Sequence, residues 1–296
     1  MTQFLSSHLK SWLFAVSVAR KHAINWVQLL AKATLRIDGE FFSRAGGSIL
    51  CDGRLLLKQL VRLEDHWHRS GDVLPVVKFG HAKLIIGNYF NREFHIPLKA
   101  KGVASPSFFF LKYPFEVKDE VVLDVGAYLG DTPLLWLQKG AKKVVAVESV
   151  PLHFSFLQEN TFGLPVECLN LSVGSRTPRL DFLEGSMSYG LAEADDIADF
   201  LDVDSVSLLE LVNKYSATVV KLNCEGCEHF VIRDLLELRS LGVKKLVVDF
   251  HDFKGIDANT TYNFLRGKLG EGRIIYEKTK LVRLDKVKRL TVLWNW

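Results

Sequence analysis

The sequence contains few cysteines and no long hydrophobic run. Four cysteines, Cys51, Cys168, Cys224 and Cys227, are spread over 296 residues. So small a number does not suit a disulfide-stabilised secreted scaffold and favours a reducing compartment. The longest early apolar stretch, Trp12 to Ala19, is too short to span a bilayer. We therefore expect a cytoplasmic protein without a secretory signal.

The sequence also lacks a concentrated charge of either sign. Its net charge is +4 and its pI is about 8.7, without a dense Lys/Arg run that includes aromatic residues. A nucleic-acid partner is therefore not indicated. Apolar residues make up 48% of the chain and charged residues 24%, which is typical of a globular protein with a sizeable core.

A further absence concerns one glycine in the segment Val121 to Ser149. This segment reads as a buried strand, a glycine turn, a helix and a second strand that ends at an acid. The nicotinamide fingerprint G-x-G-x-x-G needs its second glycine for close approach to a pyrophosphate, and Tyr128 occupies that position here. The turn between Gly126 and Gly130 still suits an adenosine ligand without a pyrophosphate, such as S-adenosyl-L-methionine.

The predicted cofactor contacts gather at the carboxyl ends of the strands. Glu148 lies 24 residues after Asp124, where its carboxylate can accept hydrogen bonds from ribose hydroxyls, as in both nicotinamide and adenosylmethionine folds. Asp131 and Thr132 are candidate helix caps, and the end of the third strand is expected beside the adenine. The full predicted set is Asp124, Gly126, Ala127, Tyr128, Gly130, Asp131, Thr132, Glu148, Ser149, Asn170, Leu171, Ser172 and Asn223.

Strands alternate with helices from residue 106 onward, which predicts an α/β fold. The predicted fold is a class I methyltransferase (Rossmann-like) fold, with a mainly parallel seven-stranded sheet and an antiparallel last strand. The strand candidates, more than the seven of the sheet, are Val121–Val125, Val144–Val147, Val166–Leu171, a short extra strand at Leu180–Leu183, Ala217–Leu222, Lys245–Phe250, Arg273–Tyr276 and a terminal antiparallel pair near Leu281–Leu284 and Leu290–Trp294.

Residues 1–105 are predicted to form an N-terminal extension, and residues 106–296 the cofactor-binding domain. The extension begins with apolar residues at helical spacing between Leu5 and Leu30. This amphipathic helix either packs on protein, which we favour, or lies on a membrane surface. A second helix over Arg54–His68 and strands at Pro75–Phe79 and Lys83–Ile86 are expected to follow.

Two motifs resemble the FkbM family of S-adenosylmethionine-dependent methyltransferases. They are Asp-Val-Gly-Ala-x-x-Gly-Asp-Thr at Asp124–Thr132, with Val-Glu-Ser after the second strand, and Lys-Leu-Asn-Cys-Glu-Gly-Cys-Glu at Lys221–Glu228. The resemblance covers roughly Val117 to His251 and implies O-methylation of a small molecule or sugar hydroxyl. Tyr128 replaces the family's usual Asn, and Asn223 replaces a carboxylate of the family motif.

Four residues are predicted to carry catalysis: Lys221, Glu225, Glu228 and His251. His251 is the best candidate for the general base because the unperturbed pKa of histidine lies near the working pH. The alternatives are a locally hydrogen-bonded histidine, glutamates that hold a turn or a partner cation, and a lysine paired with a buried carboxylate. No metal is predicted, since two further zinc ligands do not follow the C-x-x-C. Cys224 and Cys227 are therefore expected to be packing thiols.

Three functions remain open at this point. The favoured one is a methyltransferase for a small-molecule or glycan acceptor. The second is an RNA or protein methyltransferase whose N-terminal region recognises the substrate. The third is a non-catalytic nucleotide-binding module, in which the amide at Asn223 reflects lost activity.

Overall fold

A computed structural model describes most of the chain. The described residues are 13, 16–17, 19–21, 23–35, 39–42, 48–51, 67, 70–75, 77–80, 83–97, 104–174, 179–182, 189–192, 201–252, 256–282 and 285–296. The chain forms two compact units, Met1–Leu111 and Lys112–Trp296. Helix α4 (Pro106–Lys112) spans the boundary between them.

The second unit is built on a seven-stranded sheet with the order β16-β17-β15-β14-β6-β7-β8. Neighbouring strands from β15 to β8 are parallel, and β17 runs antiparallel to both β15 and β16. The strands are β6 (Val121–Val125), β7 (Lys143–Val147), β8 (Val166–Leu169), β14 (Val219–Leu222), β15 (Lys245–His251), β16 (Arg273–Val282) and β17 (Asp285–Asn295). The predicted class I methyltransferase fold is therefore confirmed.

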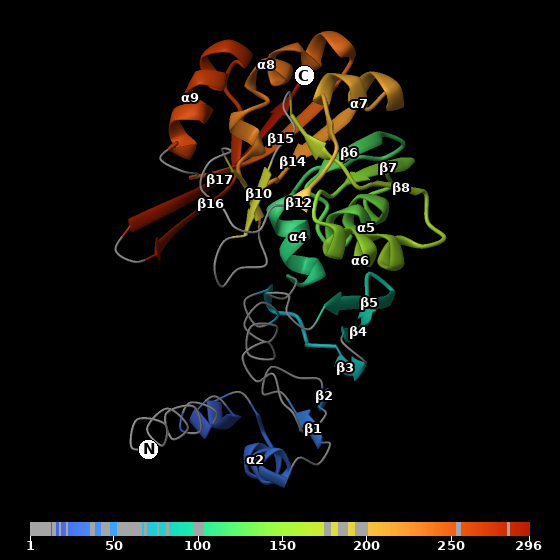
Figure 1. The fold of residues 1–296 in the computed structure, drawn as a ribbon, viewed down its shortest axis with the longest axis vertical. Coiled ribbons are helices and arrows are strands. Elements are labelled where there is room, and N and C mark those ends of the chain that lie inside the picture. Colours follow the sequence, from blue (N-terminus) through green and yellow to red (C-terminus); the bar gives the residue numbers. More distant parts are fainter. Residues whose placement is uncertain are drawn as a thin grey trace. The chain divides into compact units, whose positions relative to one another are not determined.

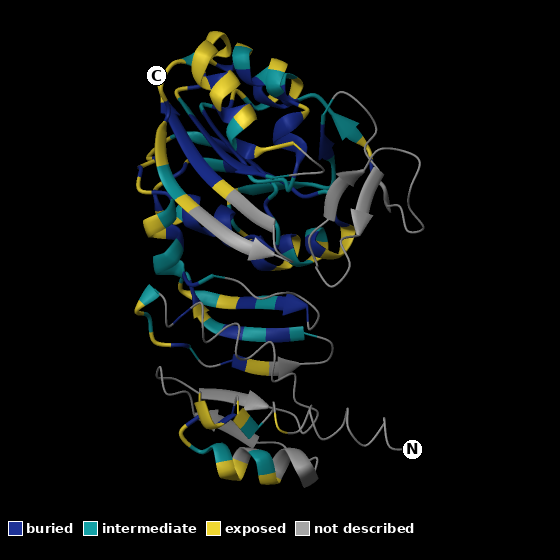
Figure 2. Cartoon of the chain, turned by 90° about the vertical axis from the view of Figure 1, so that its left-hand side faces the viewer, coloured by how far each residue is buried: buried dark blue, intermediate teal, exposed yellow. Residues whose placement is uncertain are grey.

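Helices cover both faces of this sheet (Figure 1). One face carries α7 (Leu208–Tyr215), α8 (Ile232–Glu237) and α9 (Ala258–Leu269), and the other carries α5 (Asp131–Gln138) and α6 (Pro151–Thr161). Because both faces are covered, the parallel strands are nearly continuous apolar runs rather than alternating ones. They form the buried layer in Figure 2.

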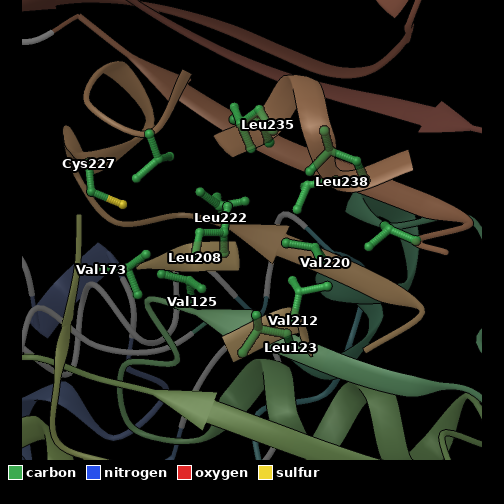
Figure 3. Close-up of a cluster of buried hydrophobic side chains, with 14 of the residues drawn as sticks. Leu123, Val125, Val173, Leu208, Val212, Val220, Leu222, Cys227, Leu235 and Leu238 are labelled. Atoms are coloured by element: carbon green, nitrogen blue, oxygen red, sulfur yellow. The ribbon is translucent and has the colours of Figure 1, made fainter. Parts of the chain in front are cut away.

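The main hydrophobic core lies between the sheet and α7, α8 and α9. Figure 3 shows Leu123 and Val125 of β6 beside Val220 and Leu222 of β14 in this cluster, and Leu235 of α8 packs there too. Successive strand residues point to opposite faces. Asp124 of β6 and Lys221 of β14 therefore point to the α5 side, away from this core.

Several element boundaries differ from the predicted ones. The third strand ends at Leu169, because Ser172–Val173 forms a separate strand, β9, that pairs with β13 (Ser205–Val206). The fourth strand begins at Val219 rather than Ala217. Strand β10 (Arg179–Phe182), which matches the extra strand expected there, joins β11 (Tyr189–Ala192) and β12 (Leu201–Asp202) in a small sheet.

The first unit contains a five-stranded sheet with the order β1-β2-β3-β4-β5. The strands are β1 (Gly39–Phe42), β2 (Ser48–Cys51), β3 (Val77–Gly80), β4 (Lys83–Tyr89) and β5 (Arg92–Pro97). The predicted strands at residues 75–79 and 83–86 correspond to β3 and β4, whereas β1, β2 and β5 were not predicted. Buried aromatic rings hold this sheet, with Tyr89 and Phe94 centroids 4.4 Å apart.

The predicted N-terminal helix is not continuous to Leu30. A turn at Ile24–Asn25 interrupts it, and a new helix, α2 (Trp26–Leu35), follows. Val27, which belongs to the predicted apolar stripe, is 59% exposed. The predicted helix at residues 54–68 lies almost entirely outside the described residues. Among the described helices, none is long and apolar enough to cross a membrane.

Candidate active site

The glycine turn after β6 is held by the ends of two neighbouring strands. The backbone N–H groups of Gly126 and Ala127 donate to the Val147 carbonyl at the end of β7, at 2.9 and 3.0 Å. Gly126 has φ +77°, and a Cβ placed there would lie 1.9 Å from the Asn223 carbonyl oxygen at the end of β14. Only glycine fits between these strands, which explains the first glycine of the motif.

The second glycine, Gly130, caps the helix that follows. It precedes α5 with φ +99° and provides no side-chain cap. The prediction that Asp131 or Thr132 caps this helix is therefore wrong, because Asp131 is already its first residue. Asn160 of α6 steadies the turn by donating to the Leu129 carbonyl at 2.8 Å.

A buried ion pair lies directly beneath the turn. Lys221 Nζ lies 2.7 Å from Asp124 Oδ1, and Trp136 Nε1 of α5 donates to Asp124 Oδ2 at 2.8 Å. Lys221 also donates to the Gly126 carbonyl at 2.8 Å. Both charged side chains are 1% exposed or less. The pair thus holds the glycine turn from below. Lys221 is paired with a buried carboxylate, which was the alternative to a catalytic role.

Asp131 and Thr132 are buried polar residues at the start of α5. Burial raises the pKa of Asp131 to about 6, although the nearby Lys221 ammonium lowers it. Its Oδ1 accepts the Thr132 N–H at 2.9 Å. Among the described residues, the buried Thr132 Oγ1 has no hydrogen-bond partner. A buried carboxylate and an unpaired hydroxyl fit a polar ligand with a positive charge, as adenosylmethionine is.

Glu148 is anchored at the end of β7. Its Oε2 accepts the Tyr128 N–H and its Oε1 accepts the Val150 N–H, both at 2.9 Å. Each carboxylate oxygen can accept a second hydrogen bond, so ribose hydroxyls can still be bound. Tyr128 adopts φ +51°, and its ring meets that of His153 edge-on at 4.7 Å between centroids. Bulk at this position is thus accommodated within the turn.

The segment predicted to contact the adenine closes the same edge of the sheet. Asn170 donates from Nδ2 to the carbonyls of Glu148 and Ser149, at 2.8 and 3.2 Å, and so ties β8 to β7. Leu171 packs against the main core. Ser172 is buried, and its N–H donates to the Asp204 carbonyl. These residues lie one strand beyond Glu148, and their contact with adenine stays a prediction.

A carboxylate–imidazole pair forms at the ends of β14 and β15. Glu228 Oε1 accepts both the backbone N–H and the Nδ1–H of His251, at 3.0 and 2.8 Å. Glu228 Oε2 accepts the Gly226 N–H at 2.9 Å. His229 lies behind the pair and donates from Nε2 to the His251 carbonyl at 2.7 Å. The neutral His251 ring therefore carries its proton on Nδ1 and keeps a lone pair on Nε2.

Two further charges face the His251 ring. Glu225 Oε1 lies 3.7 Å from His251 Nε2, and Arg289 contacts the Glu225 carboxylate at 3.4 Å. Burial alone would lower the pKa of His251, but Glu225 and Glu228 outweigh it and raise the pKa above its usual value. The imidazolium is therefore stabilised at this position.

The two aspartates at the end of β15, Asp249 within the strand and Asp252 directly after it, have structural partners. Asp249 accepts hydrogen bonds from Lys112 and Tyr113, both at 2.7 Å, and from Thr291. Burial raises its pKa, but Lys112 and these hydrogen bonds outweigh that effect and bring the value to about 2. Asp252 accepts the Ala258 N–H at the start of α9. Asp249 is therefore a poor proton acceptor, which leaves His251 and the two glutamates.

The two cysteines of the C-x-x-C form a disulfide, so the expectation of packing thiols is wrong. The turn between them explains the pairing, because Glu225 and Gly226 both have positive φ, +53° and +124°. This turn brings the two Cα atoms to 5.4 Å, within the range that a disulfide bridges. In the sequence, the two cysteines lie between Asn223 and Glu228, which are both predicted site residues.

The structure adds supporting residues that the sequence did not reveal. Trp136 holds Asp124, Asn160 holds the glycine turn, His229 holds the His251 carbonyl, and Arg289 pairs with Glu225. Arg289 could have been found only by pairing the two strands, because it lies opposite His251 in the β15–β17 register. The other three contacts join distant elements without a sequence pattern.

The predicted residues thus occupy one edge of the sheet, at the carboxyl ends of β8, β7, β6, β14 and β15. Ligands bind outside this edge in open α/β sheets. The strand order and the turn after β6 define the fold of S-adenosylmethionine-dependent methyltransferases.

Solved structures with a similar fold include several methyltransferases, all at low identity. Magnesium protoporphyrin IX methyltransferase from Synechocystis, with bound S-adenosylmethionine, is 13% identical; the match covers 62% of this chain and 74% of that one, with a TM-score of 0.37. An S-adenosylmethionine-dependent methyltransferase from Agrobacterium tumefaciens is 11% identical, with coverage of 73% and 71% and a TM-score of 0.43. Ribosomal protein L11 methylase from Lactobacillus delbrueckii is 14% identical, with coverage of 63% and 76% and a TM-score of 0.32. No protein-family model and no curated protein matches the sequence.

Proposed function

We propose that this protein is an S-adenosylmethionine-dependent methyltransferase that methylates a hydroxyl group of a small molecule or sugar. The observation that carries the proposal is the Glu228–His251 pair, which lies on the same sheet edge as the glycine turn. Strand β14 separates β6 from β15 in the sheet, and it contacts the turn through the Asn223 carbonyl. A cofactor site and a proton acceptor are thus neighbours.

The proposed cofactor site uses the residues around the glycine turn. S-adenosylmethionine, when bound, supplies an activated methyl group on a positively charged sulfur. Glu148 accepts hydrogen bonds from the ribose hydroxyls, and the backbone around Asn170 and Ser172 contacts the adenine. Asp131 provides a negative charge for the cationic end, while Asp124 and Lys221 hold the turn in place from below.

His251 acts as the general base in this proposal. Its Nε2 lone pair takes the proton from the acceptor hydroxyl as the oxygen attacks. Glu228, which already accepts the Nδ1–H, stabilises the imidazolium that forms. The requirement for a base favours a hydroxyl acceptor, because an alcohol must lose its proton during methyl transfer.

The resemblance to the FkbM family supports the same acceptor class. That family's motif has a carboxylate where this chain has Asn223. An amide cannot take a proton at neutral pH, so any base role passes to a neighbouring group. His251 has the geometry for it, since its ring lies on the next strand and is fixed by Glu228.

Transfer of a radiolabelled methyl group to defined acceptor classes tests this proposal. The full chain is incubated with labelled S-adenosylmethionine and, separately, with sugars and small hydroxylated molecules, with RNA, and with protein. We expect label in a hydroxyl acceptor, as an ether that resists mild base. Label in RNA or protein alone would favour the second function. Binding of the cofactor without transfer to any class would favour a non-catalytic module.

A further inference from the structure

The Cys224–Cys227 disulfide lies against the carboxylate that holds His251. Cys224 Sγ is 3.4 Å from Glu228 Oε2, and the other oxygen of this carboxylate accepts both hydrogen bonds from His251. Cys227 directly precedes Glu228 in a short 3-10 helix, η1 (Cys227–His229). One buried carboxylate therefore contacts the sulfur pair on one side and the imidazole on the other.

The two cysteine residues differ in exposure. Cys227 is 3% exposed, whereas Cys224 is half-buried. Cys224 is therefore the more accessible of the two to an attacking thiolate. Access decides which sulfur of a disulfide is attacked. Disulfides in reducing compartments are usually transient and redox-active rather than structural.

We propose that Cys224 and Cys227 form a reversible thiol–disulfide site, reduced by a dithiol, whose redox state changes the hydrogen bonding of Glu228 and thereby the basicity of His251. The consequence for methyl transfer rests on the proposed function. The exchange at the sulfurs and its effect on the His251 ring do not.

The exchange is balanced with a dithiol as the reductant. A thiolate of the dithiol attacks Cys224 Sγ, the S–S bond breaks, and Cys227 leaves as a thiolate that takes a proton. The second thiolate of the dithiol then attacks the mixed disulfide and releases Cys224, which is also protonated. Two electrons thus pass to the protein, and the dithiol becomes a disulfide.

The change is transmitted because a disulfide sulfur carries no proton. In the reduced form, the Cys224 thiol can donate to Glu228 Oε2 across the 3.4 Å that separates them. This donation withdraws negative charge from the carboxylate that stabilises the His251 imidazolium. Among the described residues, the other charged side chains that act on His251 are Glu225 and Arg289, and reduction of the disulfide changes the charge of neither. We therefore expect the pKa of His251 to be lower in the reduced protein.

Two measurements on the folded full chain test the proposal, in a Cys51→Ser and Cys168→Ser background that leaves one cysteine pair. The first is a titration with dithiothreitol redox buffers, in which thiols are trapped with maleimide and counted by mass. The second is the pKa of His251, measured by NMR in both redox states and assigned with His251→Gln. Cys224→Ser is the control, because it cannot form the disulfide and keeps a hydroxyl donor beside Glu228.

We expect two thiols to appear in native buffer and the His251 pKa to fall by about half a unit on reduction. Cys224→Ser should show the lower pKa in both buffers. Thiols that appear only in denaturant, or equal His251 pKa values in the two states, would overturn the proposal. Stoichiometric zinc in the reduced protein would overturn it as well, since the thiols would then be metal ligands. Absence of methyl transfer would leave both readouts unchanged and would count only against the proposed function.

Discussion

Glu228 accepts two hydrogen bonds from His251, one from the backbone N–H and one from the ring Nδ1–H, through the same carboxylate oxygen. This arrangement fixes both the position and the tautomer of the ring. It leaves Nε2 as the ring atom that can take a proton. The proposed mechanism depends on this relationship.

Replacement of His251 by Ala should remove the general base. We expect the rate of methyl transfer to fall about 100- to 10,000-fold, the usual range for such a loss. The affinity for S-adenosylmethionine should stay within a few-fold, because the predicted cofactor contacts lie elsewhere. Steady-state kinetics and calorimetry on the same preparation separate the two effects. Normal turnover on the true acceptor would make His251 structural and give proton removal to a glutamate or to water.

The pH profile should respond in opposite directions to two charge changes near His251. Glu225 raises the pKa of His251 and Arg289 lowers it. Glu225→Gln should therefore move the rising limb of the kcat/KM profile to lower pH, and Arg289→Gln should move it to higher pH. Shifts of the same sign in both variants would contradict the electrostatic account.

The raised pKa of His251 also affects stability. Stabilisation by the charged ring is fully present below the unfolded value of 6.5 and is lost as pH rises through the folded pKa. Because Glu225 raises this pKa, Glu225→Gln should make the unfolding free energy fall less as pH rises. Denaturant unfolding at pH values between about 5 and 9 measures this dependence.

The close approach of the turn after β6 to the end of β14 can be tested by replacing Gly126 with alanine. Gly163, which has a similar backbone conformation but no close neighbour, is the control. Their φ values are +77° and +74°, but a Cβ at Gly163 meets nothing within 4 Å. Alanine at either site should lose about 1–2 kcal/mol of unfolding free energy because of the left-handed backbone. Gly126→Ala should lose about 1–3 kcal/mol more because of the clash with the Asn223 carbonyl. If denaturant unfolding gave the same loss of unfolding free energy for both alanine variants, the turn after β6 would not approach the Asn223 carbonyl this closely.

Asp131 should make cofactor binding dependent on pH. Its raised pKa, about 6, means that the carboxylate loses its charge as pH falls through that value. If it faces the cationic end, affinity for S-adenosylmethionine should fall about tenfold from pH 7 to 5. Asp131→Asn should bind weakly and without this dependence, as measured by calorimetry. An unchanged dependence in the variant would place the titrating group elsewhere.

The fold of the second unit could be predicted because its signals are local. The apolar runs of β6, β7 and β15, and the Ser207 cap of α7, are each contained in a few residues. The first unit was harder to predict, since β1 and β2 are only four residues long and carry no distinctive pattern.

The partners within the site could not be predicted, because they depend on strand register. Asp124 and Lys221 are 97 residues apart in sequence and face each other only once β6 and β14 pair. Glu228 lies in η1 after β14 and meets His251 only once β14 and β15 pair and η1 lies against β15. The disulfide was missed for a different reason, since the positive φ values of the turn between the cysteines leave no clear trace in composition.

The proposed S-adenosylmethionine site is tested by calorimetric titration of the intact chain and of Glu148→Ala with this cofactor. Charge-assisted hydrogen bonds to the ribose contribute about 1.5–3 kcal/mol each. The Tyr128 and Val150 N–H groups use different oxygens of Glu148, so Glu148→Gln keeps an acceptor for only one of them. The denaturant unfolding of each variant therefore controls for loss of the local fold. We expect binding to the intact chain and at least about tenfold weaker binding to Glu148→Ala, with the fold retained. An unchanged dissociation constant, or preferential binding of a nicotinamide dinucleotide, would contradict the proposed site.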